Sequence, residues 1–171
     1  MSTLSLADDL RTAPSTFRPF RPDPVQPAVL AAALERAKLA SWRMVTVTDP
    51  AVRLAIRDAH LPHWRAHLAD TGGARILAAD APARQARDLR VADQFALNLH
   101  EAPVLLVLLG RAAGSLRTTA LAELADALRL EGMDAAPLPC VAGPCAEELA
   151  RLLDIEDGLV VSGVLAARPV R

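Results

Sequence analysis

The stretch FRPFRPDPVQPAVLAAALERAKLASWRMVTVTDP, residues 17–50, decides the fold class, because it predicts an extended segment, a helix and a strand in succession. Prolines cannot donate backbone hydrogen bonds and they disfavour helix in the residue before them, so the part that precedes Pro27 is expected to be extended. Pro27 suits the first turn of a helix, and apolar residues recur at helical spacing from there to Ala40. Residues 42–48 alternate in polarity and are rich in Val and Thr, which predicts a strand that ends at Asp49 and Pro50.

The rest of the chain alternates predicted helices with apolar strands. The predicted helices cover residues 51–60, 63–69, 82–100, 116–130 and 144–153, with a break at Pro62 and a loop at 71–73. The predicted strands cover residues 104–109, 134–140 and 159–166, and the prolines of the second one assign it to a sheet edge. The other two strands are largely apolar, which requires cover on both faces. The sequence therefore predicts an α+β domain whose central, mainly antiparallel sheet is flanked by helices.

Length and composition fit a single domain over residues 1–171, with residues 1–16 as an N-terminal arm. Hydrophobic residues make up 52% of the chain and charged residues 23%, which excludes a disordered protein. A net charge of −1 provides no electrostatic basis for binding nucleic acid or an anionic membrane, so neither is expected as a partner. The N-terminus lacks the pattern of a signal peptide, and the longest apolar run, residues 102–110, is too short to span a bilayer. We therefore expect a cytoplasmic protein.

Two groups of residues could bind a metal or react, and each has a simpler interpretation. His63 and His67 are four positions apart and His60 is close, so two imidazoles could share a helix face and hold zinc or nickel. No third ligand follows at fixed spacing, so a solvated polar face is the preferred interpretation and no metal site is predicted. Cys140 and Cys145 fit no common metal pattern, and a reducing compartment disfavours a disulfide, so they are interpreted as buried or loop thiols.

Residues 17–50 resemble the start of the flavin-dependent nitroreductase family. Arg18-Pro19-Phe20 matches the end of the family's arginine-rich motif, and Pro24-Val25 matches its Pro-Val step. Residues 34–40 match the helix that follows in the family. Trp42 matches the Trp of the family's cofactor loop, and residues 45–50 match the strand after that loop. Residues 92–110 and 147–167 resemble later family segments with less specificity. Pro14-Ser15-Thr16 replaces Arg-Arg-Ser, and Ala40-Ser41-Trp42 replaces a longer loop whose Asn and Gln reach the flavin ring. The resemblance implies a nitroreductase-like α+β fold.

The resemblance also implies a site for the cofactor FMN. Thr16 and Arg18 would bind the flavin phosphate, because a hydroxyl and a guanidinium suit phosphate oxygens. The alternative for this segment is an arm that clamps a partner subunit. Arg168 or Arg171 could add a second phosphate contact, but a solvated tail is the preferred interpretation for these two residues. No catalytic residue is assigned, since in this family the flavin performs the chemistry and the protein positions it.

Two functions from different classes follow. The first is a nitroreductase-like FMN-dependent oxidoreductase, in which NAD(P)H reduces the flavin and a small-molecule acceptor takes the electrons. The second is a nitroreductase-fold protein that has lost flavin binding and acts as a non-catalytic binding or structural dimer, which the shortened loop and the missing arginines favour. A homodimer is expected in both, because the family's dimers interlock and because the predicted helices carry more Leu and Ala than one short sheet can cover.

Overall fold

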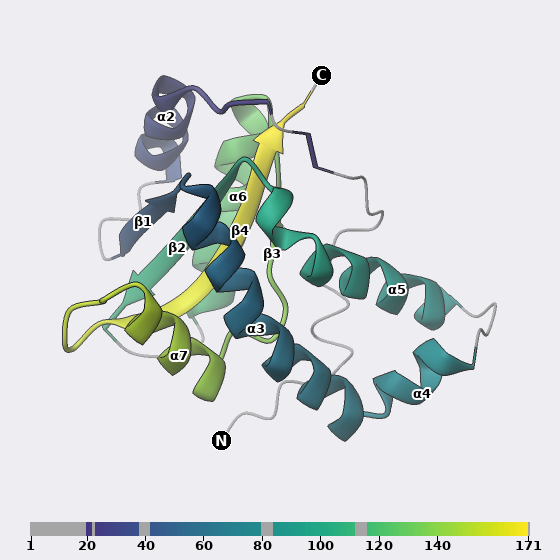
Figure 1. Ribbon diagram of the computed structural model, residues 1–171. Coiled ribbons are helices and arrows are strands. Elements are labelled where there is room, and N and C mark those ends of the chain that lie inside the picture. Colours follow the sequence, from purple (N-terminus) through teal and green to yellow (C-terminus); the bar gives the residue numbers. More distant parts are fainter. Residues whose placement is uncertain (1–19, 22, 38–41, 80–83, 112–115, 171) are drawn as a thin grey trace.

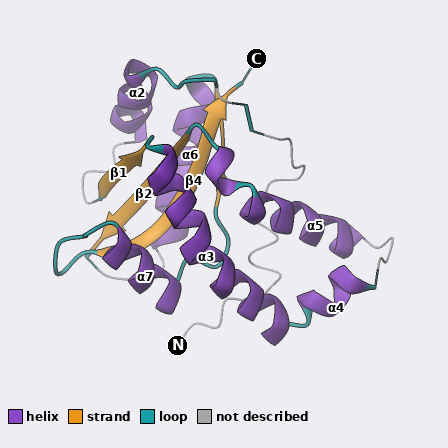
Figure 2. Ribbon diagram, viewed as in Figure 1, coloured by secondary structure: helices purple, strands orange, loops and turns teal. Residues whose placement is uncertain are grey.

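An antiparallel sheet lies at the centre of the computed structural model, which describes residues 20–21, 23–37, 42–79, 84–111 and 116–170, with no side chains described at 116–118. Its four described strands are β1 (Arg43–Val47), β2 (Val104–Gly110), β3 (Met133–Pro137) and β4 (Val160–Pro169), in the spatial order β1-β2-β4-β3. The described helices are α2 (Pro27–Ala37), α3 (Pro50–Asp70), α4 (Gly73–Ala78), α5 (Arg84–Leu97), α6 (Leu116–Leu130) and α7 (Pro144–Leu152). Helices α3 and α7 lie in front of the sheet, α6 lies behind it, and α4 and α5 extend to one side (Figure 1). Figure 2 shows the same helix and strand layers coloured by type, and the predicted α+β class is confirmed.

Strand β2 is at the centre of both hydrophobic layers, since every one of its residues is buried. Its side chains alternate between the two faces of the sheet. Val104 and Leu106 pack with α2 and α6, whereas Leu105 and Val107 pack with α3, α5 and α7. Because both faces of the sheet are covered here, the side chains on either face of β2 pack against apolar residues. This explains why the strand contains no polar residue. The prediction of a strand covered on both faces is confirmed.

Strand β3 occupies an edge of the sheet, as its prolines predicted. Among the described strands it pairs with β4 alone, with Asp134 opposite Arg168 and Pro137 opposite Leu165. A proline is tolerated at such an edge because its missing N–H removes no hydrogen bond from a second neighbour. The fixed register has a chemical consequence, since it places an acid directly across from a base.

Helix α3 is one continuous helix, and the predicted break at Pro62 was wrong. Asp49 caps its start, and the Oδ1 of Asp49 accepts a hydrogen bond from the N–H of Ala51 at 2.8 Å. Four buried side chains follow at intervals of four residues along the helix, namely Ile56, His60, Trp64 and Leu68. This buried stripe runs on both sides of the exposed Pro62, and its burial offsets the loss of about 3 kcal/mol that a proline causes inside a helix.

Other predicted boundaries also differ from the structure: β3 ends at Pro137 and not at residue 140, and β4 continues to Pro169 and not to residue 166. The loop expected at 71–73 is shorter, because Gly72 adopts a φ of 79° and α4 begins at Gly73. The helix expected over 82–100 is divided into α5 and the 3-10 helix η1 (Leu99–Glu101), and Pro82 lies outside the described residues. Arg53 of α3 donates hydrogen bonds to the carbonyl oxygen of His100 at 3.2 Å and to that of Ala102, which ties the end of η1 to α3.

Helix α3, with 21 residues, is the longest of the described helices, and charged side chains occur along its length. In the part of the chain that the structure describes, no helix combines the length and the apolar character that crossing a bilayer requires.

Candidate functional site

Arg168, near the end of β4, is the residue of the predicted cofactor site that the structure describes; Thr16, Arg18 and Arg171 lie outside the described residues. In the β3–β4 register Arg168 stands directly opposite Asp134. Its Nη2 and Nε donate hydrogen bonds to the Oδ2 of Asp134 at 2.9 and 3.3 Å. The side chain of Arg168 is 20% exposed and that of Asp134 is 50% exposed. Arg168 is therefore held at the sheet edge and does not belong to a solvated tail.

The guanidinium of Arg168 also lies against an aromatic ring. Its Cζ is 5.8 Å from the centroid of the Phe20 ring, which is within the range of a cation–π contact. The Phe20 ring in turn lies 6.0 Å from the ring of Phe95 on α5. The Phe20 ring therefore contacts both the end of β4 and α5. The sequence could not predict this contact, because it joins opposite ends of the chain.

The chemistry of this corner suits a phosphate group. A guanidinium is always charged and donates parallel N–H groups in the geometry that phosphate oxygens accept. The carboxylate of Asp134 already uses the Nε and Nη2 donors of Arg168, so a phosphate has to displace this carboxylate or share the guanidinium with it. The described residues therefore fit the phosphate end of FMN in donor type through Arg168, whose charge is offset by the carboxylate of Asp134.

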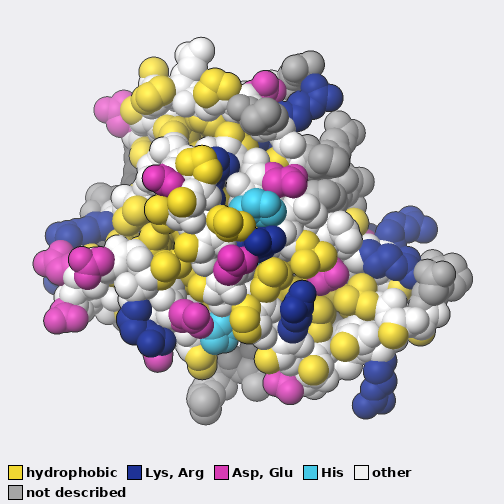
Figure 3. Space-filling view, in the orientation of Figure 1, with side chains coloured by type: hydrophobic (Ala, Val, Ile, Leu, Met, Phe, Trp, Pro, Cys, Tyr) yellow, Lys and Arg dark blue, Asp and Glu magenta, His cyan; other side chains and the backbone are white. Residues whose placement is uncertain are grey.

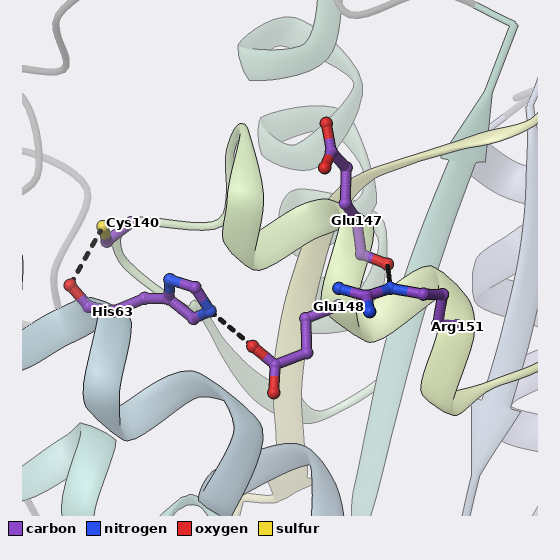
Figure 4. A network of polar contacts seen from close by, with 5 residues as sticks. All are labelled: His63, Cys140, Glu147, Glu148 and Arg151. Atoms are coloured by element: carbon purple, nitrogen blue, oxygen red, sulfur yellow. Dashed lines mark hydrogen bonds and ion pairs between the residues drawn. The ribbon is translucent and has the colours of Figure 1, made fainter.

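The three histidines of α3 do not form one solvated polar face, and that interpretation was wrong. His63 Nε2 lies 2.6 Å from Oε2 of Glu148 on α7, in a partly exposed contact between the two helices (Figure 4). The ring of His67 stacks on a tryptophan ring of the same helix at 5.9 Å. His60 is fully buried, and its Nε2 lies 2.8 Å from the carbonyl oxygen of Pro139. Among the described residues, no three His, Cys, Asp or Glu side chains gather closely enough to hold a metal ion.

Burial determines the protonation state of His60. Desolvation is the main reason why its pKa falls from 6.5 to about 4; the hydrogen bond to Pro139 acts in the opposite direction, and the charge of His63 lowers the pKa further. His60 is therefore neutral near pH 7, with a proton on Nε2 that it donates to Pro139. The residue joins α3 to the turn that follows β3, which is a structural role.

Cys140 and Cys145 are free thiols that flank the start of α7. Cys145 is buried, and desolvation raises its pKa to about 12, with further contributions from the charges of Cys140 and Glu148. Cys140 is partly exposed, and its Sγ lies 4.0 Å from the carbonyl oxygen of His63 (Figure 4). Because the thiolate is the reactive form of cysteine, burial makes Cys145 inert at neutral pH.

A polar cleft of about 620 Å³ lies at the end of the sheet where β1 begins and β2 ends. Trp42, Arg43 and Arg111 line it together with the turn that precedes β4. Arg43 Nη1 forms an ion pair with Oε2 of Glu156 at 2.9 Å, and both side chains are mostly exposed. Trp42 packs closely on Gly110, where a Cβ atom would lie 2.4 Å from the indole ring. Of the residues that line this cleft, the sequence analysis singled out only Trp42. The arginines and the turn are far apart in the sequence, and the pairing of the strands brings them together.

No protein-family model matches the chain, and no curated protein matches it in sequence. Solved structures are similar over nearly its whole length. A mutant of the FMN and NADPH-dependent nitroreductase NfnB from Sphigopyxis sp. strain HMH is 20% identical, with a TM-score of 0.63 over 98% of this chain and 89% of that one. NfnB from Mycobacterium smegmatis, in complex with NADPH, is 20% identical, with a TM-score of 0.59 over 96% of this chain and 87% of that one.

A third similar structure is an iodotyrosine deiodinase bound to FMN and 3-iodo-L-tyrosine. It is 19% identical, with a TM-score of 0.59 over 97% of this chain and 90% of that one. The chain therefore has the nitroreductase fold, which confirms the fold that the resemblance of residues 17–50 implied. At these identities the similarity defines the fold and leaves the activity to be argued from the site.

Proposed function

We propose that this chain is an FMN-dependent NAD(P)H oxidoreductase of the nitroreductase type that passes electrons to a small-molecule acceptor. Support comes from the fold, since the similar structures include nitroreductases that are described as dependent on FMN and NADPH. The observation that carries the proposal is the contact between Arg168 and Phe20. Arg168 is one of the predicted phosphate-binding residues, and Phe20 is two positions from another, Arg18, in the sequence.

Arg18, Thr16 and Arg168 would hold the flavin phosphate through charge-assisted hydrogen bonds. When bound, FMN supplies the redox chemistry, because it accepts a hydride from a nicotinamide and passes electrons to an acceptor. The chain's own contribution is to bind and orient the cofactor. Ala40, Ser41 and Trp42 stand where the family has Asn and Gln donors to the ring, so we expect loose ring binding and slow turnover.

We propose further that the protein is a cytoplasmic homodimer of single-domain subunits. Several large apolar side chains are exposed, namely Leu54 (38%), Leu152 (42%), Val170 (58%) and Leu130 (71%). On the face formed by α3 and α7, hydrophobic side chains are interspersed with charged ones (Figure 3). Burial of such side chains against a second copy is the usual source of stability in obligate dimers. Sedimentation should show a dimer at low micromolar concentration, and a stable monomer there would contradict the proposal.

The direct test is a fluorescence titration of the purified protein with FMN, followed by assays of NADH and NADPH oxidation with excess FMN. A charge-assisted contact contributes on the order of 1.5–3 kcal/mol, so Arg18→Ala should weaken FMN binding by roughly ten- to a hundredfold. Arg36→Gln is the matched control, because Arg36 is paired with Glu131 and is not a predicted phosphate ligand, so this change should weaken FMN binding far less than Arg18→Ala. Absence of FMN binding at millimolar concentration would refute the proposal and favour the non-catalytic dimer.

A further inference from the structure

We infer that Asp134 sets the selectivity of this chain for phosphorylated flavin, because its carboxylate competes with the FMN phosphate for Arg168. The inference rests on the proposed function, since it takes the end of β4 as the phosphate site. It concerns a residue that neither the sequence pattern nor the resemblance to nitroreductases indicated.

The first support is the way in which Asp134 is held in place. Asp134 and Arg168 are cross-strand partners in the β3–β4 ladder, so the backbone pairing keeps the carboxylate beside the guanidinium. Both Nε and Nη2 of Arg168 donate to the same oxygen, Oδ2 of Asp134, at 3.3 and 2.9 Å. These two nitrogens form one of the two edges through which a guanidinium can make a bidentate contact with a phosphate.

The second support is that Arg168 has little room to avoid this competition. Its side chain is only 20% exposed, and the Phe20 ring lies 5.8 Å from its Cζ. An unconstrained surface arginine could swing away from an aspartate to meet a ligand. Arg168 is limited on one side by its strand partner and on another by the aromatic ring, so an incoming phosphate meets the guanidinium with the Asp134 carboxylate close by.

The charge of the ligand distinguishes this role from a merely structural one. The phosphate of FMN is anionic, whereas riboflavin has the same ring and ribityl chain without the phosphate. Asp134 therefore disfavours FMN by repulsion and by occupying donors, and it leaves riboflavin unaffected. The ratio of the FMN affinity to the riboflavin affinity reports on the competition and cancels any general effect on the ring pocket.

The test is a titration of the full chain with FMN and with riboflavin, followed by flavin fluorescence, for the wild type and for Asp134→Asn. The substitution keeps the shape of the side chain and removes its charge. We expect FMN to bind about tenfold more tightly to Asp134→Asn, as removal of one nearby like charge at the protein surface predicts. Riboflavin affinity should change less than about twofold.

Two controls accompany this variant. Glu131→Gln removes the same charge from the neighbouring ion pair with Arg36, whose Nη2 lies 2.8 Å from Oε1 of Glu131. It should change FMN affinity less than Asp134→Asn does, because the carboxylate of Glu131 pairs with Arg36 and that of Asp134 pairs with Arg168. In Asp134→Asn combined with Arg168→Gln, the gain in FMN affinity should disappear. Thermal melting should show that all variants are folded, since exposed ion pairs contribute only about 0–1 kcal/mol to stability.

The outcomes separate the inference from the proposed function. Suppose that the wild type binds FMN, and that Asp134→Asn either leaves the FMN affinity unchanged or raises the affinities for FMN and riboflavin equally. The competition between Asp134 and the phosphate is then refuted, and the proposed function stands. The same holds if Glu131→Gln reproduces the effect, since the cause would then be the general charge of the surface. If no variant binds either flavin at millimolar concentration, both conclusions are overturned.

Discussion

The stability of the fold should depend on pH through His60. His60 is fully buried and neutral in the folded protein, with its pKa lowered from 6.5 to about 4, chiefly by desolvation. In the unfolded chain the imidazole takes up a proton near its ordinary pKa, so the unfolded state binds more protons below pH 6.5. The contribution of His60 to the free energy of unfolding is therefore fully present above pH 6.5 and is lost as the pH falls toward 4.

The magnitude follows from the difference between the two pKa values. A gap of about 2.5 pH units, at about 1.4 kcal/mol per unit, corresponds to roughly 3 kcal/mol. At pH 5 the loss should be about 2 kcal/mol, because the folded form is still almost entirely unprotonated there. This loss is a large part of the stability of an ordinary domain, which is about 5–15 kcal/mol.

The assay compares the wild type with His60→Gln by urea unfolding at several pH values between 7.5 and 5. The glutamine amide can still donate to the carbonyl oxygen of Pro139, which His60 Nε2 contacts at 2.8 Å, but it does not titrate. Other groups of the protein titrate in both variants, so the difference between them isolates His60. We expect this difference to shrink by about 2 kcal/mol between pH 7.5 and pH 5. A difference that stays constant over this range would show that His60 does not titrate as its burial requires.

Two further predictions concern packing and thiol reactivity. Gly110→Ala should lower the free energy of unfolding by about 1–3 kcal/mol, because the new Cβ would lie 2.4 Å from the ring of Trp42; a thermal melt equal to that of the wild type would contradict the packing. Iodoacetamide at pH 7.5 should modify the partly exposed Cys140 and leave Cys145 unmodified, since burial raises the pKa of Cys145 to about 12. Mass spectrometry identifies the modified residue, and alkylation of Cys145 before Cys140 in the native protein would refute this assignment.

The sequence alone determined the layers of this fold. The apolar run at 104–109 has no polar residue on either face and is bounded by Pro103 and Gly110, which favours a strand covered on both sides. Pro137 assigned its strand to an edge, because a proline cannot supply a hydrogen bond to a second neighbour. Both conclusions depend on the chemistry of residues within one element. Such features are local, so a single sequence is sufficient to detect them.

Local features were misleading where burial on one helix outweighed a local preference. Pro62 predicted a break, yet α3 continues through it because Ile56, His60, Trp64 and Leu68 are buried on one face. The spacing of these four residues was present in the sequence. The sequence could not show that this stripe would outweigh the helix-breaking effect of Pro62. Periodicity identifies the apolar face of a helix, but it does not show what packs against that face. The same reason explains why His60 was assigned to a solvated surface and was found in the core.

The candidate site was decided by tertiary structure. The sequence resemblance named Arg18 and Arg168 as phosphate ligands, and Arg168 remains a prediction in that role. Its pairing with Asp134 depends on the register of β3 against β4, and its contact with Phe20 depends on the path of the N-terminal segment. Strand register and chain path result from the packing of segments that are distant in sequence, so no local pattern of residues could have specified them.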